Sequence, residues 1–171
     1  MTTLPPTPAY AYRYTLDREL AAGLTLPRCL LVIVGMNPST ADADKDDPTS
    51  RAWRYFGSRM GATHYRAVNL YAIRATDPGD LGRFHSAGVD VVGPSNDAYV
   101  QDAITCADLV WCAWGSPKSP RPPRIDNRIR IVSEAIQRAR VRAVCLGFNA
   151  DGNPKHALYL PHKSEFQPWP K

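Results

Sequence analysis

A short polar segment from Gly35 to Thr40 contains residue types that suit the binding of a ligand. Pro38 restricts the backbone of Asn37 toward extended geometry and itself lacks a backbone donor. Gly35 allows a ligand to approach the backbone closely, or the chain to take a positive φ. An amide held in this way could position a water molecule or contact the edge of a planar base. We favour this interpretation over a plain Asx-Pro turn.

An acidic stretch follows directly, with four aspartates at Asp42, Asp44, Asp46 and Asp47. A carboxylate here could orient or activate water, or stabilise a developing positive charge. Binding of Ca²⁺ or Mg²⁺ is a further option, although the regular EF-hand spacing is absent. For each single aspartate the simpler interpretation is a solvated loop in which Asp46 or Asp47 caps a helix. Asp44 and Asp47 are the catalytic candidates of this stretch.

Three further side chains could contact a ligand, and each also has an ordinary structural interpretation. Asn69 lies among apolar residues, where an amide costs about 1–3 kcal/mol unless it is paired. It serves either structural hydrogen bonding or recognition of a ligand's donor–acceptor edge. Trp114 could stack on a flat ligand, although core packing is the commoner role. His156 is either structural or functional, and both interpretations remain open.

These residues need a scaffold, and the hydrophobic pattern predicts strands that alternate with helices. The apolar, β-branched run at residues 29–34 indicates a strand buried on both faces. Further strands are predicted at residues 66–73, 109–114 and 141–146. Helices are predicted at residues 49–61, 96–107 and 125–140, with a short helix near Leu81. Shorter extended segments are expected at residues 12–16 and 156–160.

This order predicts an α/β fold, a three-layer α/β/α sandwich with a mainly parallel central sheet of about four strands. In such folds the ligand site lies beyond the carboxyl ends of the strands. The unusual polar segments all follow strand ends, so four loops could form one pocket. We expect a single domain over residues 1–171, with residues 1–10 as a flexible N-terminal segment.

Composition narrows the function classes. No apolar run approaches the roughly 20 residues that cross a bilayer, and the N-terminus does not resemble a signal peptide. We therefore expect a cytoplasmic protein, without a membrane partner, and a monomer. A net charge of +5 is compatible with nucleic acid as partner. The four cysteines lack metal-ligand spacing. Cys29, Cys112 and Cys145 lie in apolar runs that predict strands, so we expect buried, reduced thiols, with no metal and no cofactor.

Several signatures are absent from the chain: the P-loop, G-x-G-x-x-G, G-x-S-x-G and H-E-x-x-H. Their absence argues against NTPases, Rossmann dehydrogenases, typical α/β-hydrolases and zincins.

The chain closely resembles a bacterial and phage family described as a domain of unknown function. The matching stretches include GMNPSTADADKDD at residues 35–47, VNLYAIRATDP at 68–78, GPSND at 93–97, AWG at 113–115 and DGNPKHALYLP at 151–161. Their order is distantly similar to that of the uracil-DNA glycosylase superfamily. There, a G-x-[DN]-P loop handles the water, a strand with an asparagine recognises the base, a W-G step follows a later strand, and a histidine loop stabilises the departing base. The usual H-P-S-P-L run of that loop is not present here.

This resemblance implies a uracil-DNA-glycosylase-like fold and a DNA glycosylase that flips and excises a uracil-like or modified base. Asn69 would read the base edge, and His156 would favour charge on the departing base. Asn37, or one of Asp44 and Asp47, would place the attacking water. Substrate contacts are expected from the loop and rim residues Gly35, Met36, Pro38, Ser39, Trp114 and Gly115. Tyr71 and Phe148 could stack on the base. Arg74, Lys118 and Arg121 could contact phosphates.

Two alternatives remain at this stage. The protein could be a non-catalytic nucleic-acid or nucleotide-binding protein that uses the same pocket, or an enzyme that acts on free nucleotides or nucleosides. Free nucleotides would bind without the steep salt dependence that several phosphate contacts produce. The base, and the choice of DNA over RNA, do not follow from the sequence.

Overall fold

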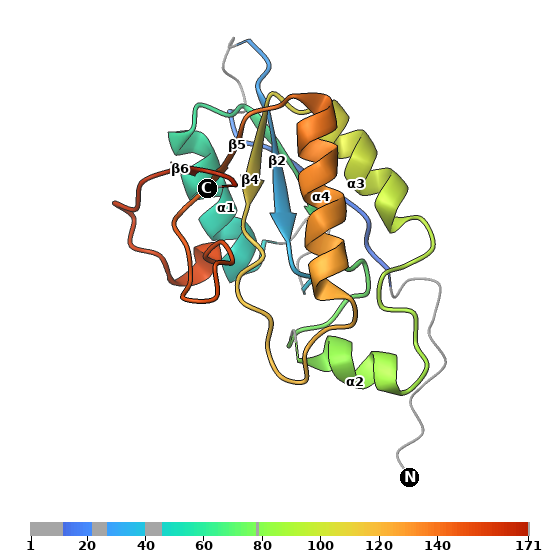
Figure 1. Cartoon of the computed structure of the whole chain (residues 1–171). Helices are drawn as coiled ribbons and strands as arrows, with labels where there is room; N and C mark the ends of the chain where they lie inside the picture. The colour runs from blue at the N-terminus through green and yellow to red at the C-terminus, as the bar shows by residue number, and fades with distance from the viewer. Residues whose placement is uncertain (1–11, 22–26, 40–45, 78, 171) are drawn as a thin grey trace.

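A computed structural model describes residues 12–21, 27–39, 46–77 and 79–170 (Figure 1). Six strands and four α-helices are present in this part of the chain. The elements in chain order are β1 (Leu16–Glu19), β2 (Leu30–Gly35), α1 (Pro48–Arg59), β3 (His64–Asn69), α2 (Asp80–Ser86), α3 (Asn96–Thr105), β4 (Leu109–Cys112), α4 (Ile125–Ala139), β5 (Ala143–Cys145), the 3₁₀ helix η2 (Ala157–Tyr159) and β6 (Gln167–Pro168).

The strands form one mixed sheet in the order β1-β3-β2-β4-β5-β6. The pairs β3–β2, β2–β4 and β4–β5 are parallel, and the two edge strands β1 and β6 pair antiparallel. The prediction of about four strands is therefore corrected to six. Strand β6 has only two residues, one of them a proline, so it carries no recognisable strand pattern.

Helices cover both faces of the sheet (Figure 1). All six residues of β2 are buried. Val32 and Val34 belong to the hydrophobic cluster under α3 and α4, whereas Leu31 and Ile33 belong to the cluster under α1. Successive residues of a strand point to opposite faces, so a strand covered on both sides must be apolar throughout. This burial explains why the β2 run was recognisable in the sequence.

Two predicted extended segments differ from the structure. The segment at residues 12–16 becomes strand β1 only from Leu16 onward, because Tyr12 and Tyr14 form an aromatic stack that continues onto Tyr99 of α3. The segment at residues 156–160 forms η2 instead of a strand. The helix near Leu81 is present as α2.

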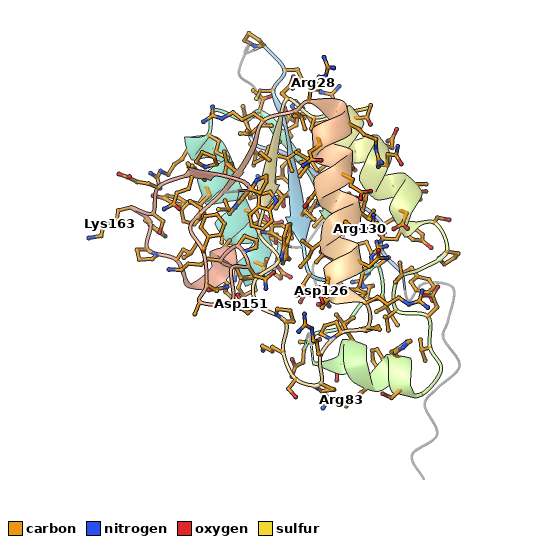
Figure 2. The ribbon with its side chains drawn as sticks, viewed as in Figure 1. Arg28, Arg83, Asp126, Arg130, Asp151 and Lys163 are labelled. Atoms are coloured by element: carbon orange, nitrogen blue, oxygen red, sulfur yellow. The ribbon has the colours of Figure 1, made fainter. Side chains whose placement is uncertain are left out.

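The four central strands direct their carboxyl ends to one end of the molecule. In Figure 2, Asp126 and Asp151 lie at the end toward which β2 points, and Arg28 lies at the opposite end. Within the described residues, no helix combines the length and the apolar character needed to cross a membrane.

Candidate functional site

A cavity of about 410 Å³ opens where β2, β3 and β4 end. Ligand sites typically have volumes of about 300–1,000 Å³, so this cavity is large enough for a small organic group. Most of the candidates named from the sequence contribute to its wall. These are Gly35, Met36, Asn37, Ser39, Asp47, Asn69, Trp114, Gly115, Lys118 and His156.

Asn69 is the most constrained polar group of this wall. It is the last residue of β3 and pairs in register with Gly35 of β2. Its side chain is only 2% exposed, and its Oδ1 has no hydrogen-bond partner in the part of the chain that the structure describes. A Cβ at residue 35 would lie 2.6 Å from this oxygen. Glycine at position 35 therefore makes room for the Asn69 amide.

Hydrogen bonds from two helices hold the backbone of β3 at this point. The Asn96 side chain, at the start of α3, donates from Nδ2 to the carbonyls of Asn69 (3.1 Å) and Leu70 (3.2 Å). Arg128 of α4 donates from Nε to the Leu70 carbonyl at 2.8 Å and forms an ion pair with Asp97. Asn96 and Arg128 are both buried. This network fixes the direction in which Asn69 leaves the strand.

Trp53 of α1 also lines the cavity, although it was not among the candidate residues. Its ring packs edge-to-face on Tyr65, with centroids 6.2 Å apart. Its buried Nε1 finds no acceptor among the described residues. Trp53 Nε1 and Asn69 Oδ1 are thus a donor and an acceptor without partners among the described residues, on two side chains that line one cavity. Apolar spacing along α1 gave no signal for this polar role.

The Asn37 amide joins two loops. Its Nδ2 donates to the carbonyl of Ala75 at 2.7 Å and to that of Pro38 at 3.1 Å. The backbone of Ala75 donates in return to the Pro38 carbonyl at 3.0 Å. The side-chain nitrogen of Asn37 is therefore occupied by structural hydrogen bonds. The side-chain oxygen, Oδ1, is the atom of this amide that could accept a hydrogen bond from a ligand. Pro38 is buried and does not line the cavity.

His156 provides a neutral donor. Its Nδ1 accepts a hydrogen bond from the backbone N–H of Leu158 at 3.2 Å, so the neutral ring carries its proton on Nε2. Burial lowers the pKa of His156; Asp47 opposes this shift and Lys118 adds to it. Gly115 has a φ of +74°, and a Cβ there would lie 3.2 Å from the His156 Cβ. Gly115 thus permits both the turn and the close packing of His156.

Asp47 combines a place in the cavity wall with a structural role. It is the N-cap of α1, and its Oδ1 accepts from the Ser50 N–H at 2.7 Å. The Ser50 hydroxyl accepts from the Asp47 N–H at 2.8 Å, which completes a capping box. Asp46 instead pairs with Arg18 and Arg54; burial opposes the effect of these hydrogen bonds, but its pKa is lowered. The candidate Asp44 lies outside the described residues.

Two cations border the cavity. Arg13, which was not among the candidates, is half-buried at its wall. Burial, followed by the nearby Arg74, lowers the pKa of Arg13 to about 10, so the guanidinium stays charged at neutral pH. Lys118 is exposed and lies 3.6 Å from Asp77. An exposed ion pair of this kind contributes little, so Lys118 can exchange its partner for a ligand anion.

Besides Pro38, four of the described candidates do not line this cavity: Tyr71, Arg74, Arg121 and Phe148. Tyr71 is fully buried and donates its hydroxyl to the Pro123 carbonyl at 2.7 Å, and burial raises the pKa of its phenol. Phe148 stacks on Trp169, with centroids 5.7 Å apart. Arg74 is exposed on the surface. The sequence placed Tyr71 near a strand end but did not show which way its ring points.

Trp114 is 2% exposed and reaches the cavity only in part. Its Nε1 donates to Asn153 Oδ1 at 3.0 Å, and its ring packs edge-to-face on Trp169. It therefore acts as a fixed wall more than as an open stacking face. In the segments that the structure describes, no three His, Cys, Asp or Glu side chains gather as metal ligands would.

One comparison with known proteins gives a result. The family model described as "Protein of unknown function (DUF1643)" matches residues 13–158. No curated protein and no solved structure matches the chain at a significant level. The matched range contains all the cavity residues discussed above.

Proposed function

Since the chain belongs to the DUF1643 family of proteins of unknown function, we propose its activity from the cavity itself: a DNA glycosylase-like enzyme that hydrolyses the N-glycosidic bond of a flipped uracil-like or modified base. The order of its motifs resembles that of the uracil-DNA glycosylase superfamily. The parallel central strands, with helices on both faces, support the proposal only as a general scaffold whose site lies at the carboxyl ends of the strands. A nucleotide flipped from a duplex would enter the cavity at a cost of a few kcal/mol.

The observation that carries this proposal is the unpaired amide oxygen of Asn69. A buried acceptor without a partner costs about 1–3 kcal/mol, and neighbouring helices hold its backbone in place. A fixed amide can read the donor–acceptor edge of a base. The unpaired Nε1 of Trp53 adds a donor to the same cavity. Such a set suits a planar ligand that carries both donors and acceptors.

The proposed chemistry is hydrolysis. The oxygen of a water molecule forms a bond with the anomeric carbon of the sugar, and the bond between that carbon and the base nitrogen breaks. The electron pair of that bond leaves with the base. Nε2–H of His156 donates a hydrogen bond to the base as negative charge develops, a role that needs a neutral imidazole. Asn37 Oδ1 orients the water, and the Asp47 carboxylate accepts its proton.

A second candidate is a non-catalytic nucleotide-binding protein. Asp47 is the acidic side chain of the cavity wall in the described part of the chain, and it already accepts the cap hydrogen bond of α1. A carboxylate in that position is less available as a base. This candidate keeps the roles of Asn69 and Trp53 and omits the chemical step.

Both candidates can be tested with oligonucleotides, single-stranded and duplex, that carry uracil, mismatched or modified bases. The proposed enzyme produces abasic sites, detected by alkaline strand cleavage, together with free base. His156→Gln should reduce base release by about a hundredfold, and His85→Gln, at an exposed histidine of α2, should leave it unchanged. Binding without base release would favour the second candidate. Absence of both would reject the proposal.

A further inference from the structure

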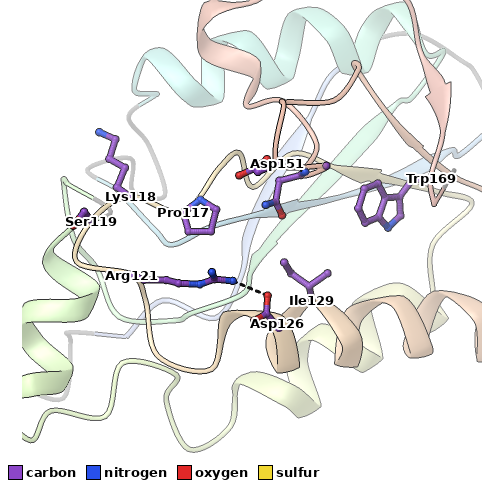
Figure 3. A pocket seen from close by; sticks show the side chains of 10 residues that line it. Pro117, Lys118, Ser119, Arg121, Asp126, Ile129, Asp151 and Trp169 are labelled. Carbon is purple, nitrogen blue, oxygen red and sulfur yellow. Dashed lines mark hydrogen bonds and ion pairs between the residues drawn. The ribbon is translucent and has the colours of Figure 1, made fainter.

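The structure has a second cavity, of about 540 Å³ (Figure 3). It lies between α4, which contributes Asp126 and Ile129, and the loop that carries Asp151. Trp169 lies toward one end of this cavity and Lys118 toward the other (Figure 3). Trp169 follows β6, beyond the residues matched to the family.

The two cavities share a rim and a wall. Lys118 lines both of them. Trp114 lines the first cavity, and its Nε1 donates to Asn153, which lines the second. Trp114 also packs edge-to-face on Trp169, with ring centroids 5.1 Å apart and an interplanar angle of 87°. A ligand that fills both cavities would therefore pass Lys118 and the partition formed by Trp114.

The second cavity changes in character along its length. Ile129 and Trp169 are half-buried apolar side chains near one end. Trp169 is held in orientation by its stack on Phe148, and its Nε1 has no acceptor in the described part of the chain. Lys118 supplies a positive charge at the other end. Arg121 is a second cation of this cavity, and its ion pair with Asp126 at 2.8 Å is as exposed as that of Lys118.

We infer that the second cavity is a subsite for the nucleotide adjacent to the one bound in the first cavity. Its base would contact Ile129 and Trp169, and the phosphate that joins the two nucleotides would lie at Lys118. This inference rests on the proposed function and deepens it, because it makes the substrate a polynucleotide strand. A free nucleoside would leave the second cavity and its lysine unused.

The test compares the affinities of a 5′-mononucleotide and of a trinucleotide with the same central base, for uracil, thymine and hypoxanthine, by titration calorimetry. The wild-type protein should bind the trinucleotide about tenfold or more tightly than the mononucleotide, the size of effect that one stacked base produces. Ile129→Glu and Trp169→Leu should each reduce this gain to about threefold or less. Arg130→Ala, at an exposed position of α4 outside both cavities, should leave it intact.

Circular dichroism shows whether each variant is folded. Because the two substitutions are made separately, the test still holds if one of the variants does not fold. Equal affinity for both probes, a gain that survives in both folded variants, or no binding of any probe would overturn the inference. Base release provides a separate measurement. Release from a free nucleoside as fast as from an oligonucleotide would overturn the subsite and leave glycosidic hydrolysis standing. The affinity gain without base release would reject the proposed reaction and leave the subsite standing.

Discussion

At the scale of single residues, the side-chain oxygen of Asn69 is a buried acceptor without a hydrogen-bond partner among the described residues. Two buried side chains, Asn96 and Arg128, donate hydrogen bonds to the backbone carbonyls of Asn69 and Leu70. None of the described residues satisfies the amide oxygen itself. The Oδ1 of Asn96 is also without a partner among the described residues, but Asn96 does not line the cavity, whereas Asn69 does. The arrangement therefore favours a ligand as the missing partner.

Replacement of Asn69 by leucine tests this interpretation. The substitution removes the unpaired buried acceptor, so the free energy of unfolding should stay within about 1 kcal/mol of wild type or increase. Nucleotide binding should weaken by about tenfold or more, since the reading group is lost. Urea denaturation and calorimetry measure the two effects, with Asn127→Leu on the exposed face of α4 as control. A loss of more than about 2 kcal/mol of stability would assign the amide a structural role.

His156 predicts a pH dependence of stability. Its pKa in the folded protein lies below the ordinary value of 6.5, chiefly because of burial. As the pH falls below 6.5, the unfolded chain takes up this proton first, so the unfolded state gains stability. The contribution of the neutral imidazole is therefore complete above about pH 6.5 and is lost progressively at lower pH, toward the folded pKa.

Urea denaturation between pH 8 and pH 5 measures this effect. The free energy of unfolding of wild type should fall more steeply below pH 6.5 than that of His156→Phe, which has no titrating ring. His64→Phe, a half-buried histidine on β3 outside the cavity, serves as the comparison. Parallel pH profiles for wild type and His156→Phe would show that the ring is not held neutral by burial.

At the scale of elements, the start of α1 brings the Asp47 cap and the cavity together. Pro48 occupies the first turn, and the capping box satisfies the backbone N–H groups of Asp47 and Ser50. The same carboxylate lies in the cavity wall. Helix capping and water activation therefore compete for one side chain, and the two roles can be separated by choice of substitution.

The pair Asp47→Asn and Asp47→Ala makes this separation. Asparagine caps helices about as well as aspartate, so Asp47→Asn should change the free energy of unfolding by less than about 0.5 kcal/mol, whereas Asp47→Ala should cost about 0.5–2 kcal/mol. If Asp47 accepts the proton of the water, both variants should lose base release by about a hundredfold. Thermal denaturation and the oligonucleotide assay measure the two effects. Full activity of the asparagine variant would exclude Asp47 as the base.

At the scale of the whole molecule, the chain has a net charge of +5, and two of its cations, Arg13 and Lys118, line the cavity. Phosphate neutralisation releases counterions, so the logarithm of the binding constant should fall by about 0.7 per phosphate contact for each unit of log salt concentration on a single strand. Fluorescence anisotropy of a labelled oligonucleotide between low and moderate salt measures this slope. Lys118→Ala should reduce the slope, and Lys163→Ala, at an exposed lysine outside both cavities, should not. A flat salt profile would favour a free nucleotide as ligand.

Much of the fold could be predicted from local pattern. The β2 run was recognisable because burial on both faces requires continuous apolar residues. Helix α4 was recognisable because Val132 and Ile136 repeat at helical spacing and face the core. Strand β6 was not, since two residues with a proline acquire strand geometry only by pairing with β5. The limits of β1 were misplaced for a similar reason, because the contacts of Tyr14 with α3 lie far along the chain.

The candidate site divides in the same way. The sequence by itself determined that Gly35, Asn37 and Gly115 end or follow strands, and parallel strands bring such ends to one edge. It predicted Asn69 inside a strand at residues 66–73, whereas β3 ends at Asn69. Only the tertiary structure decided which side chains face the cavity. In the structure, the Tyr71 ring points into the core, and the side-chain nitrogen of Asn37 joins two loops. Arg13 and Trp53, which were not candidates, line the cavity. The physical reason is that the presence of each strand follows from local hydrophobicity, whereas the partner of each polar atom depends on residues distant in sequence.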